Sequence, residues 1–240
     1  MPSWSMAKKS NLQAKTKIIG PIINFLFPQS CFVCRKPGKP ICSECIKSFA
    51  PAKLRCLKCG RANPFGLYCK PCHSKSNANL VLAGFDYKNP IASLIHQFKY
   101  EDVTSLSDPF CDCLAALLSK IPDNLEYKIC YIPLTLKKLK SRGYNQSKLL
   151  AEGIGQCLNI PVTGLLTRVE ARESQVIAQS RKLRKTNIKG AFSIKSGAEI
   201  PQKVILLDDV ITTGATVEEA VKVLKAAGVK EVIVLALALD

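Results

Sequence analysis

Two groups of residues in this chain have types and spacings that can do chemistry. In the last fifth of the sequence, the stretch VILLDDVITTGAT places two adjacent carboxylates directly after an apolar run and follows them with a hydroxyl-rich turn. In the first third, eight cysteines form four CxxC pairs. The first group has the residue types of a loop that binds anions and hydroxyl groups, and the second has those of metal sites.

The eight paired cysteines lie between residues 31 and 72, and successive pairs are separated by seven, ten and nine residues. Two residues between cysteines let both thiolates of a pair face one tetrahedral ion, and two pairs complete a four-thiolate site. We therefore expect two zinc sites with these ligands: Cys31, Cys34, Cys42, Cys45, Cys56, Cys59, Cys69 and Cys72. The spacing fits a sequential assignment of pairs to the two ions, and it also fits a crossed arrangement of alternate pairs.

Four thiolates around one ion leave no position for water, so the expected zinc sites are structural rather than catalytic. An iron–sulfur cluster is the alternative for such ligands, but the regular paired spacing fits zinc better. His73 directly follows Cys72, and we interpret it as a neighbour of the site rather than a ligand.

The acidic pair Asp208 and Asp209 follows the apolar run 204–207, which has the character of a buried strand. Open α/β sheets bind ligands at the carboxyl ends of their strands, where this pair would emerge. The following turn contains small and hydroxyl residues: Thr212, Thr213, Gly214, Ala215 and Thr216. Backbone N–H groups at such a turn, with the dipole of the helix behind it, form a phosphate-binding site.

Thr216 and Glu219 have the spacing of a capping box, so we expect the helix to begin near Thr216. Two carboxylates beside a phosphate site cannot both serve the phosphate, so they should take ribose hydroxyls or a magnesium ion. The loop as a whole thus predicts a site for a sugar phosphate. An ATPase of the P-loop class would need GxxxxGK[ST], which this sequence lacks.

The net charge of +17 is concentrated in the first third of the chain. Residues 1–79 hold 14 Lys and Arg against the single acid Glu44, a balance of +13, whereas residues 80–240 hold 21 against 17, a balance of +4. Clustered cations release counterions from nucleic acid when they bind it, so the asymmetry favours a polyanionic partner. A basic surface that only aids solubility is the alternative.

Cysteine usage and the absence of a convincing secretion signal predict a reduced, cytoplasmic protein. The apolar run 18–27 follows basic residues, but Gly20 and Pro21 interrupt it and no small-residue cleavage site follows. The run is also too short to span a bilayer.

Composition divides the chain into three parts. We expect a disordered basic segment over 1–17, an apolar lead-in helix and the zinc module over 18–73, and, after a polar linker, a second domain over 80–240. In the second domain, apolar runs at 81–87, 127–133, 203–209 and 231–239 alternate with helical patterns at 90–99, 106–118, 146–158 and 217–227. Strands that alternate with helices predict an α/β fold with a mostly parallel sheet.

The loop VILLDDVITTGAT closely resembles the ligand-binding loop of type I phosphoribosyltransferases. Three further segments, NFLFPQSCFVC, LKKLKSRGYNQSKLLAEGI and SQVIAQSRKLRKTNIKGAF, together with the CxxC pairs, resemble the ComF family of competence-associated phosphoribosyltransferase-like proteins. The resemblance covers nearly the whole chain beyond residue 17. It implies a type I phosphoribosyltransferase-like fold behind a small four-cysteine zinc-ribbon module, with 5-phosphoribosyl 1-diphosphate and Mg²⁺ as the ligands.

The resemblance also implies roles for individual residues. The acidic pair would contact the ribose 2′- and 3′-hydroxyls, the turn at 212–216 would hold the 5′-phosphate, and Arg142 would stabilise the diphosphate. Gly143, Tyr144, Asn145 and Gln146 would complete a mobile loop over that diphosphate. By the same analogy Lys99 and a later set consisting of Gln175, Arg181, Arg184 and Asn187 would lie near the cleft, although the basic-glycine turn that often follows the lysine is replaced here by YEDVTS.

Two functions remain open on sequence alone, because a third, a purely structural or docking protein with a relict site, does not account for a loop that has every ligand-binding residue type. The first is a competence protein of bacterial DNA uptake that binds 5-phosphoribosyl 1-diphosphate and single-stranded DNA and works with other competence or DNA-processing proteins. The second is an active phosphoribosyltransferase of nucleotide salvage or synthesis, with Arg142, Asp208 and Asp209 as its catalytic residues and a purely structural zinc ribbon. An acceptor-dependent release of diphosphate would separate the two.

Overall fold

The computed structural model describes residues 29–75, 77–169 and 189–240. The chain divides into two compact units, residues 1–48 and 49–240, and each is described by itself. The expectations for the segment 1–17, for the helix at 18–27, and for Gln175, Arg181, Arg184 and Asn187 lie outside the described residues.

The described part of the first unit is organised around four cysteines. Its one helix, α2 (Ser43–Ser48), follows two short turns that hydrogen bonds close: the Cys31 N–H donates to the Lys36 carbonyl (2.8 Å) and the Phe32 N–H donates to the Pro40 carbonyl (2.9 Å). Cys31 and Ile41 are almost fully buried although the segment is short. So few apolar residues cannot form an ordinary core, which is the situation in which a metal usually supplies the stability.

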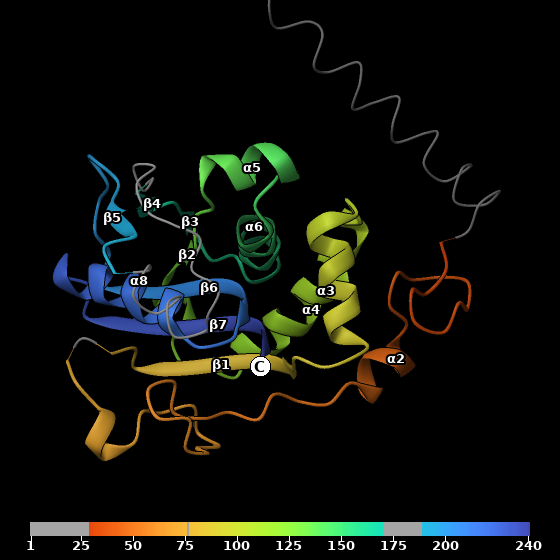
Figure 1. Cartoon of the computed structure of the whole chain (residues 1–240), viewed down its shortest axis with the longest axis horizontal. Coiled ribbons are helices and arrows are strands. Elements are labelled where there is room, and N and C mark those ends of the chain that lie inside the picture. The colour runs from red at the N-terminus through yellow and green to blue at the C-terminus, as the bar shows by residue number, and fades with distance from the viewer. Residues whose placement is uncertain (1–28, 76, 170–188) are drawn as a thin grey trace, which may run out of the picture. The chain divides into compact units, whose positions relative to one another are not determined.

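A five-stranded parallel sheet forms the centre of the second unit, with strand order β1-β7-β6-β2-β3 (Figure 1). The strands are β1 (Leu80–Asp86), β2 (Lys128–Tyr131), β3 (Val162–Thr163), β6 (Lys203–Ile211) and β7 (Glu231–Leu239). The continuous apolar run of β7 is buried on both faces because β7 lies between two neighbours and is covered from both sides. The α/β fold with a mostly parallel sheet is confirmed.

Helices cover both faces of the sheet. On one face α4 (Ser107–Leu118) contacts β1 and β7, and α6 (Gln146–Leu158) contacts β2 and β6. On the other face the side chains of Val204 and Leu206 of β6 share an apolar cluster with α8 (Ala215–Ala226). Alternate residues of a strand point to opposite faces, so β6 contributes to both halves of the core.

The segment from Phe49 to the start of β1, which contains the last four paired cysteines, packs on the same face as α8. Leu57 and Tyr68 join the apolar cluster that includes Val81 of β1. The segment also pairs with β1: Asp86 N–H donates to the Ala50 carbonyl (2.9 Å), and Val81 N–H donates to the Gly66 carbonyl (2.9 Å). It therefore covers an edge strand that would otherwise expose unpaired backbone groups.

We expect Gly66→Ala to destabilise the second unit strongly. Gly66 has φ +66°, and a Cβ placed on it would lie 2.0 Å from the carbonyl oxygen of Val81. Gly197 has a similar φ of +73° with nothing within 4 Å, so Gly197→Ala isolates the backbone strain of about 1 kcal/mol from the steric clash. Urea unfolding should show a loss of at least about 3 kcal/mol for Gly66→Ala, and equal losses in the two variants would contradict this packing.

The remaining elements are small. α3 (Ile91–Tyr100) precedes α4, α5 (Leu136–Arg142) precedes α6, and β4 (Leu166–Arg168) pairs antiparallel with β5 (Phe192–Ile194) beside the main sheet. Single 3₁₀ turns occur at Lys70–Cys72, Thr104–Leu106 and Asn124–Glu126. Among the described residues, no helix is both long enough and apolar enough to cross a bilayer.

Candidate functional site

The acidic pair lies near the carboxyl end of β6, which continues past both carboxylates to Ile211. Asp209 is 8% exposed. Its Oδ1 forms an ion pair with Nζ of Lys99 at the end of α3, at a distance of 2.8 Å. Asp208 Oδ1 accepts hydrogen bonds from Ser147 Oγ of α6 (3.2 Å) and from the backbone N–H of Asp209 (2.9 Å). The structure thus places Lys99 in the site, as the family resemblance implied.

Burial, together with the adjacent Asp209 carboxylate, raises the pKa of Asp208 to about 7. The N–H of Asp209, the ammonium of Lys99 and the hydroxyl of Ser147 act in the opposite direction without cancelling the effect. Two carboxylates therefore share one lysine in a partly desolvated site. Such a site has capacity for additional hydrogen-bond donors, such as sugar hydroxyls, or for a divalent cation.

The turn after β6 forms a small concave pocket that Asp208 and residues 210–217 line. Gly214 has φ +78°, which favours glycine, and α8 begins immediately after it at Ala215. The helix thus begins near Thr216 as expected, but the expected capping box is wrong: the N-cap residue is Gly214, and Glu219 Oε1 accepts from the Gly190 N–H (2.7 Å). The first N–H groups of a helix have no partners within the helix, so the start of this 12-residue helix can still supply N–H donors to a phosphate.

The residues on either side of Cys56, the fifth of the paired cysteines, contact this turn. Arg55 Nη2 donates to the carbonyl oxygen of Thr212 (3.3 Å), and the Cβ of Leu57 would lie 3.2 Å from a Cβ placed on Gly214. Sequence reasoning missed both residues. No local signal could have found them, because Arg55 and Thr212 are 157 positions apart.

The RGYNQ segment joins α5 to α6. Gly143 ends α5 in the left-handed region (φ +80°), and the Asn145 side chain caps α6 by accepting from the Lys148 N–H (3.2 Å). The Tyr144 hydroxyl donates to the Phe98 carbonyl, and Gln146 Nε2 donates to the Lys99 carbonyl (3.5 Å). These contacts tie the segment to the end of α3 that supplies Lys99.

Arg142 lies over the ring of Tyr100, with its Cζ 4.7 Å from the ring centroid, and its Nη1 donates to Gln146 Oε1 (2.5 Å). Both of these contacts are therefore with α3 and α6 rather than with the acidic pair. Lys99 contacts Asp209 directly. Arg142 contacts Gln146, and Gln146 in turn donates to the Lys99 carbonyl, so Arg142 is linked to the acidic pair indirectly.

The paired cysteines gather into two groups of four, in sequence order. Cys31, Cys34, Cys42 and Cys45 form one group and Cys56, Cys59, Cys69 and Cys72 form the other, with all sulfurs of a group within 4.8 Å of one another. The crossed arrangement is thereby excluded. Sulfur–sulfur distances of 3.7 Å (Cys34–Cys42), 3.5 Å (Cys59–Cys69) and 3.8 Å (Cys69–Cys56) match the edge of about 3.8 Å that Zn–S bonds of 2.3 Å give a tetrahedron.

The two groups repeat one local geometry. Arg35 and Gly60, each directly after a CxxC pair, have φ +63° and +76°, and their N–H groups donate to the carbonyls of Cys31 (2.9 Å) and Cys56 (2.8 Å). Burial alone would raise the pKa of Cys31 and Cys56, but backbone N–H groups directed at each sulfur outweigh burial and lower both to about 6. The residues therefore fit structural zinc, and among the described residues neither group includes a histidine.

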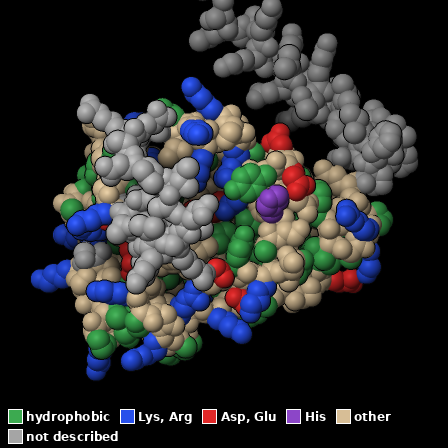
Figure 2. Space-filling view, viewed as in Figure 1, with side chains coloured by type: hydrophobic (Ala, Val, Ile, Leu, Met, Phe, Trp, Pro, Cys, Tyr) green, Lys and Arg blue, Asp and Glu red, His purple; other side chains and the backbone are tan. Residues whose placement is uncertain are grey.

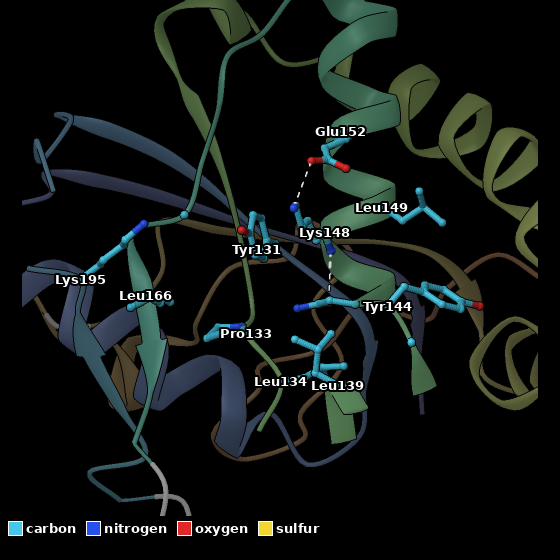
Figure 3. A pocket seen from close by; sticks show the side chains of 13 residues that line it. Tyr131, Pro133, Leu134, Leu139, Tyr144, Lys148, Leu149, Glu152, Leu166 and Lys195 are labelled. Atoms are coloured by element: carbon cyan, nitrogen blue, oxygen red, sulfur yellow. Dashed lines mark hydrogen bonds and ion pairs between the residues drawn. The ribbon is translucent and has the colours of Figure 1, made fainter. Parts of the chain in front are cut away.

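A separate groove of about 490 Å³ opens between β2, α5, α6 and β4. Figure 3 shows Tyr131 and the Lys148–Glu152 ion pair (3.6 Å) on one side of it and Leu166 and Lys195 on the other. Tyr144 and Asn145 of the RGYNQ segment also line the groove. Its volume lies within the usual range for small-molecule sites.

Comparison with known proteins identifies both parts of the chain. Residues 143–240 match the model of the phosphoribosyl transferase domain, and residues 22–73 match the model of the double zinc ribbon domain. Competence protein F of Haemophilus influenzae is 33% identical over an alignment of 236 positions that covers 90% of this chain and 99% of that protein.

Two other relatives match over most of the chain as well. DNA utilization protein YhgH of Escherichia coli K12 is 30% identical over 211 residues, covering 82% of this chain and 91% of that protein. Competence protein ComFC of Streptococcus pneumoniae is 28% identical over 207 residues, covering 85% and 89%. The chain therefore belongs to the ComF family, in which a double zinc ribbon precedes a domain with the type I phosphoribosyltransferase fold.

Proposed function

We propose that this protein binds 5-phosphoribosyl 1-diphosphate with Mg²⁺ at the β6–α8 turn, binds single-stranded DNA, and acts in the cytoplasm on DNA taken up during natural transformation. The observation that carries the ligand assignment is the acidic pair, placed beside Lys99 and directly ahead of the Gly214 turn and the start of α8. The names of the relatives supply the biological context.

The proposed roles follow from the contacts. Asp208 and Asp209 accept hydrogen bonds from the ribose hydroxyls, and Lys99 fixes the orientation of Asp209 while it balances part of the charge. The 5′-phosphate receives N–H donors from the turn at 212–216 and the first turn of α8. Arg142, which contacts Tyr100 at the end of α3 and Gln146 at the start of α6, would bind the diphosphate, whose oxygens would hold Mg²⁺.

The DNA assignment rests on charge. Residues 1–79 carry a balance of +13, and two zinc ions with eight thiolates lower this to about +9 because each four-thiolate site contributes −2. Figure 2 shows Lys and Arg side chains spread over much of the visible surface. Aromatic residues between the cations, Phe65 among them at 74% exposure, are available to stack on bases.

We expect single-stranded DNA binding to weaken steeply with salt. Each phosphate contact contributes about −0.7 to the slope of log K against log salt, so four contacts give a loss of about 50-fold between 50 and 200 mM salt. Fluorescence anisotropy with a labelled oligonucleotide measures this, and an uncharged peptide nucleic acid of the same sequence serves as the control. Binding that is insensitive to salt would contradict the charge argument.

The groove beside the RGYNQ segment favours one second function. A cavity of about 490 Å³ with two tyrosines and two lysines in its lining could receive an acceptor, which an active phosphoribosyltransferase requires. In that case a nucleobase or amine would release diphosphate from 5-phosphoribosyl 1-diphosphate in the presence of Mg²⁺. An enzyme-coupled diphosphate assay over a panel of acceptors decides between the two, because the DNA-handling function predicts binding without acceptor-dependent release.

A further inference from the structure

The first CxxC knuckle of the second zinc site, residues 55–60, forms one wall of the turn that we assign to the ribosyl phosphate. Leu57 lies between the zinc ligands Cys56 and Cys59, is 9% exposed, and packs against Gly214. Arg55 anchors the carbonyl of Thr212 from the same side (3.3 Å). Both contacts lie within the one compact unit that spans residues 49–240.

The contact continues from the turn into the helix behind it. Leu57 and Tyr68 share an apolar cluster with Val217 and Val221 of α8. Burial raises the pKa of Tyr68, and the charge of Glu218 in the first turn of α8 raises it further, which places the two side chains close together. The ribbon thus contacts the turn and the first two turns of the helix whose start would hold the phosphate.

The position of Leu57 depends on the metal. Cys56 is 1% exposed and lies 3.8 Å from Cys69, sulfur to sulfur. Four thiolates at such distances repel one another unless a cation lies between them. Without the ion the knuckle would open, and Arg55 and Leu57 would no longer hold the turn.

We propose that zinc at Cys56, Cys59, Cys69 and Cys72 positions the ribosyl-phosphate turn, so that ligand binding and zinc retention at this site are thermodynamically linked. This inference rests on the proposed function. Linkage is reciprocal: if the ion strengthens ligand binding, the ligand must strengthen retention of the ion by the same factor.

The first zinc site provides an internal control. Its knuckle has the same backbone geometry, with Phe32 at the position that corresponds to Leu57, but it belongs to the other compact unit. The structure shows no contact of this kind for Phe32 among the described residues of its own unit. The linkage should therefore concern one zinc ion of the two.

The test measures zinc release from the holoprotein into a chromophoric chelator with low affinity for Mg²⁺, with and without saturating 5-phosphoribosyl 1-diphosphate and Mg²⁺. We expect the ligand to slow the release of one ion at least tenfold and to leave the other unchanged. Cys34→Ser and Cys59→Ser, which each remove one site, assign the two phases: protection should persist in Cys34→Ser and be absent in Cys59→Ser. The linkage would be overturned if a ligand concentration that calorimetry shows to be saturating left the release rates of both ions unchanged.

A second set of variants keeps both ions in place. Leu57→Ala should weaken ligand binding five- to twentyfold with two zinc ions per chain retained, whereas Leu57→Met, which fills the same space, should remain within twofold of the wild type. Phe32→Ala is the matched control and should bind normally. Normal binding by Leu57→Ala refutes the positioning role, whereas a wild-type protein that binds no ligand refutes the proposed function and the inference with it.

Discussion

Asp208→Asn should weaken ligand binding at least about 30-fold and, at pH 8, stabilise the fold. Burial and the neighbouring Asp209 raise the pKa of Asp208 from its ordinary 3.8 to about 7. A carboxyl group whose pKa is higher in the folded than in the unfolded protein destabilises the fold when it is ionised. The cost is therefore absent below about pH 4, grows as the pH rises, and is complete above about pH 7, where it amounts to at most about 4 kcal/mol.

The measurement pairs thermal unfolding at pH 5 and pH 8 with calorimetric titration of 5-phosphoribosyl 1-diphosphate and Mg²⁺. Asparagine keeps the size of the side chain and its acceptor for Ser147, so the stabilisation should be larger at pH 8 than at pH 5. Ligand affinity should fall at least about 30-fold because a charged acceptor of the ribose hydroxyls is lost. Asp112→Asn, at an exposed position of α4, should change neither property. A variant that binds normally and gains no stability at pH 8 would contradict our description of the site.

Loss of one zinc ligand should have very different effects at the two sites. Cys56 is 1% exposed and belongs to the apolar cluster that includes α8, β1 and β6, so Cys56→Ser should destabilise the whole unit of residues 49–240. A loss of about 3 kcal/mol or more corresponds to a Tm lower by roughly 6–12 °C for a unit of this size. Cys31→Ser, at a site that is equally buried but lies in the other unit, should leave that transition within about 2 °C.

Differential scanning calorimetry combined with zinc analysis makes this comparison. Each variant should lose one zinc ion per chain, which confirms that the substitution acted on the intended site. Equal shifts of the main transition in the two variants would show that the second ribbon is not part of the sheet unit's core.

The larger elements could be predicted from the sequence because local signals and burial agree in them. α6 has an asparagine cap at Asn145, apolar residues at helical spacing, and a left-handed Asn159 at its end, and its predicted bounds of 146–158 match the structure. β7 is a continuous apolar run, and its predicted bounds also match. α5 was missed because it is only seven residues long and buries none of them, and its two leucines, Leu136 and Leu139, are too few to define a helical pattern.

The site was predictable in its residue types but not in its contacts. Asp208 and Asp209 are adjacent in the sequence, and their place at the end of a strand followed from the apolar run before them. The Lys99–Asp209 ion pair joins residues 110 positions apart. The docking of Arg55 on Thr212 and the sequential pairing of the cysteines likewise depend on the tertiary fold, which no local pattern encodes.

The most direct test of the central claim is calorimetric titration of the zinc-loaded protein with 5-phosphoribosyl 1-diphosphate and Mg²⁺, repeated with single-stranded DNA present. We expect one binding site per chain, with an affinity that is at least about 30-fold lower in Asp208→Asn and with an affinity or enthalpy that DNA changes. Absence of binding by the wild-type protein, or equal binding by Asp208→Asn, would contradict the assignment of the β6–α8 turn. Binding that DNA leaves unchanged would contradict the DNA-handling function and favour the active transferase.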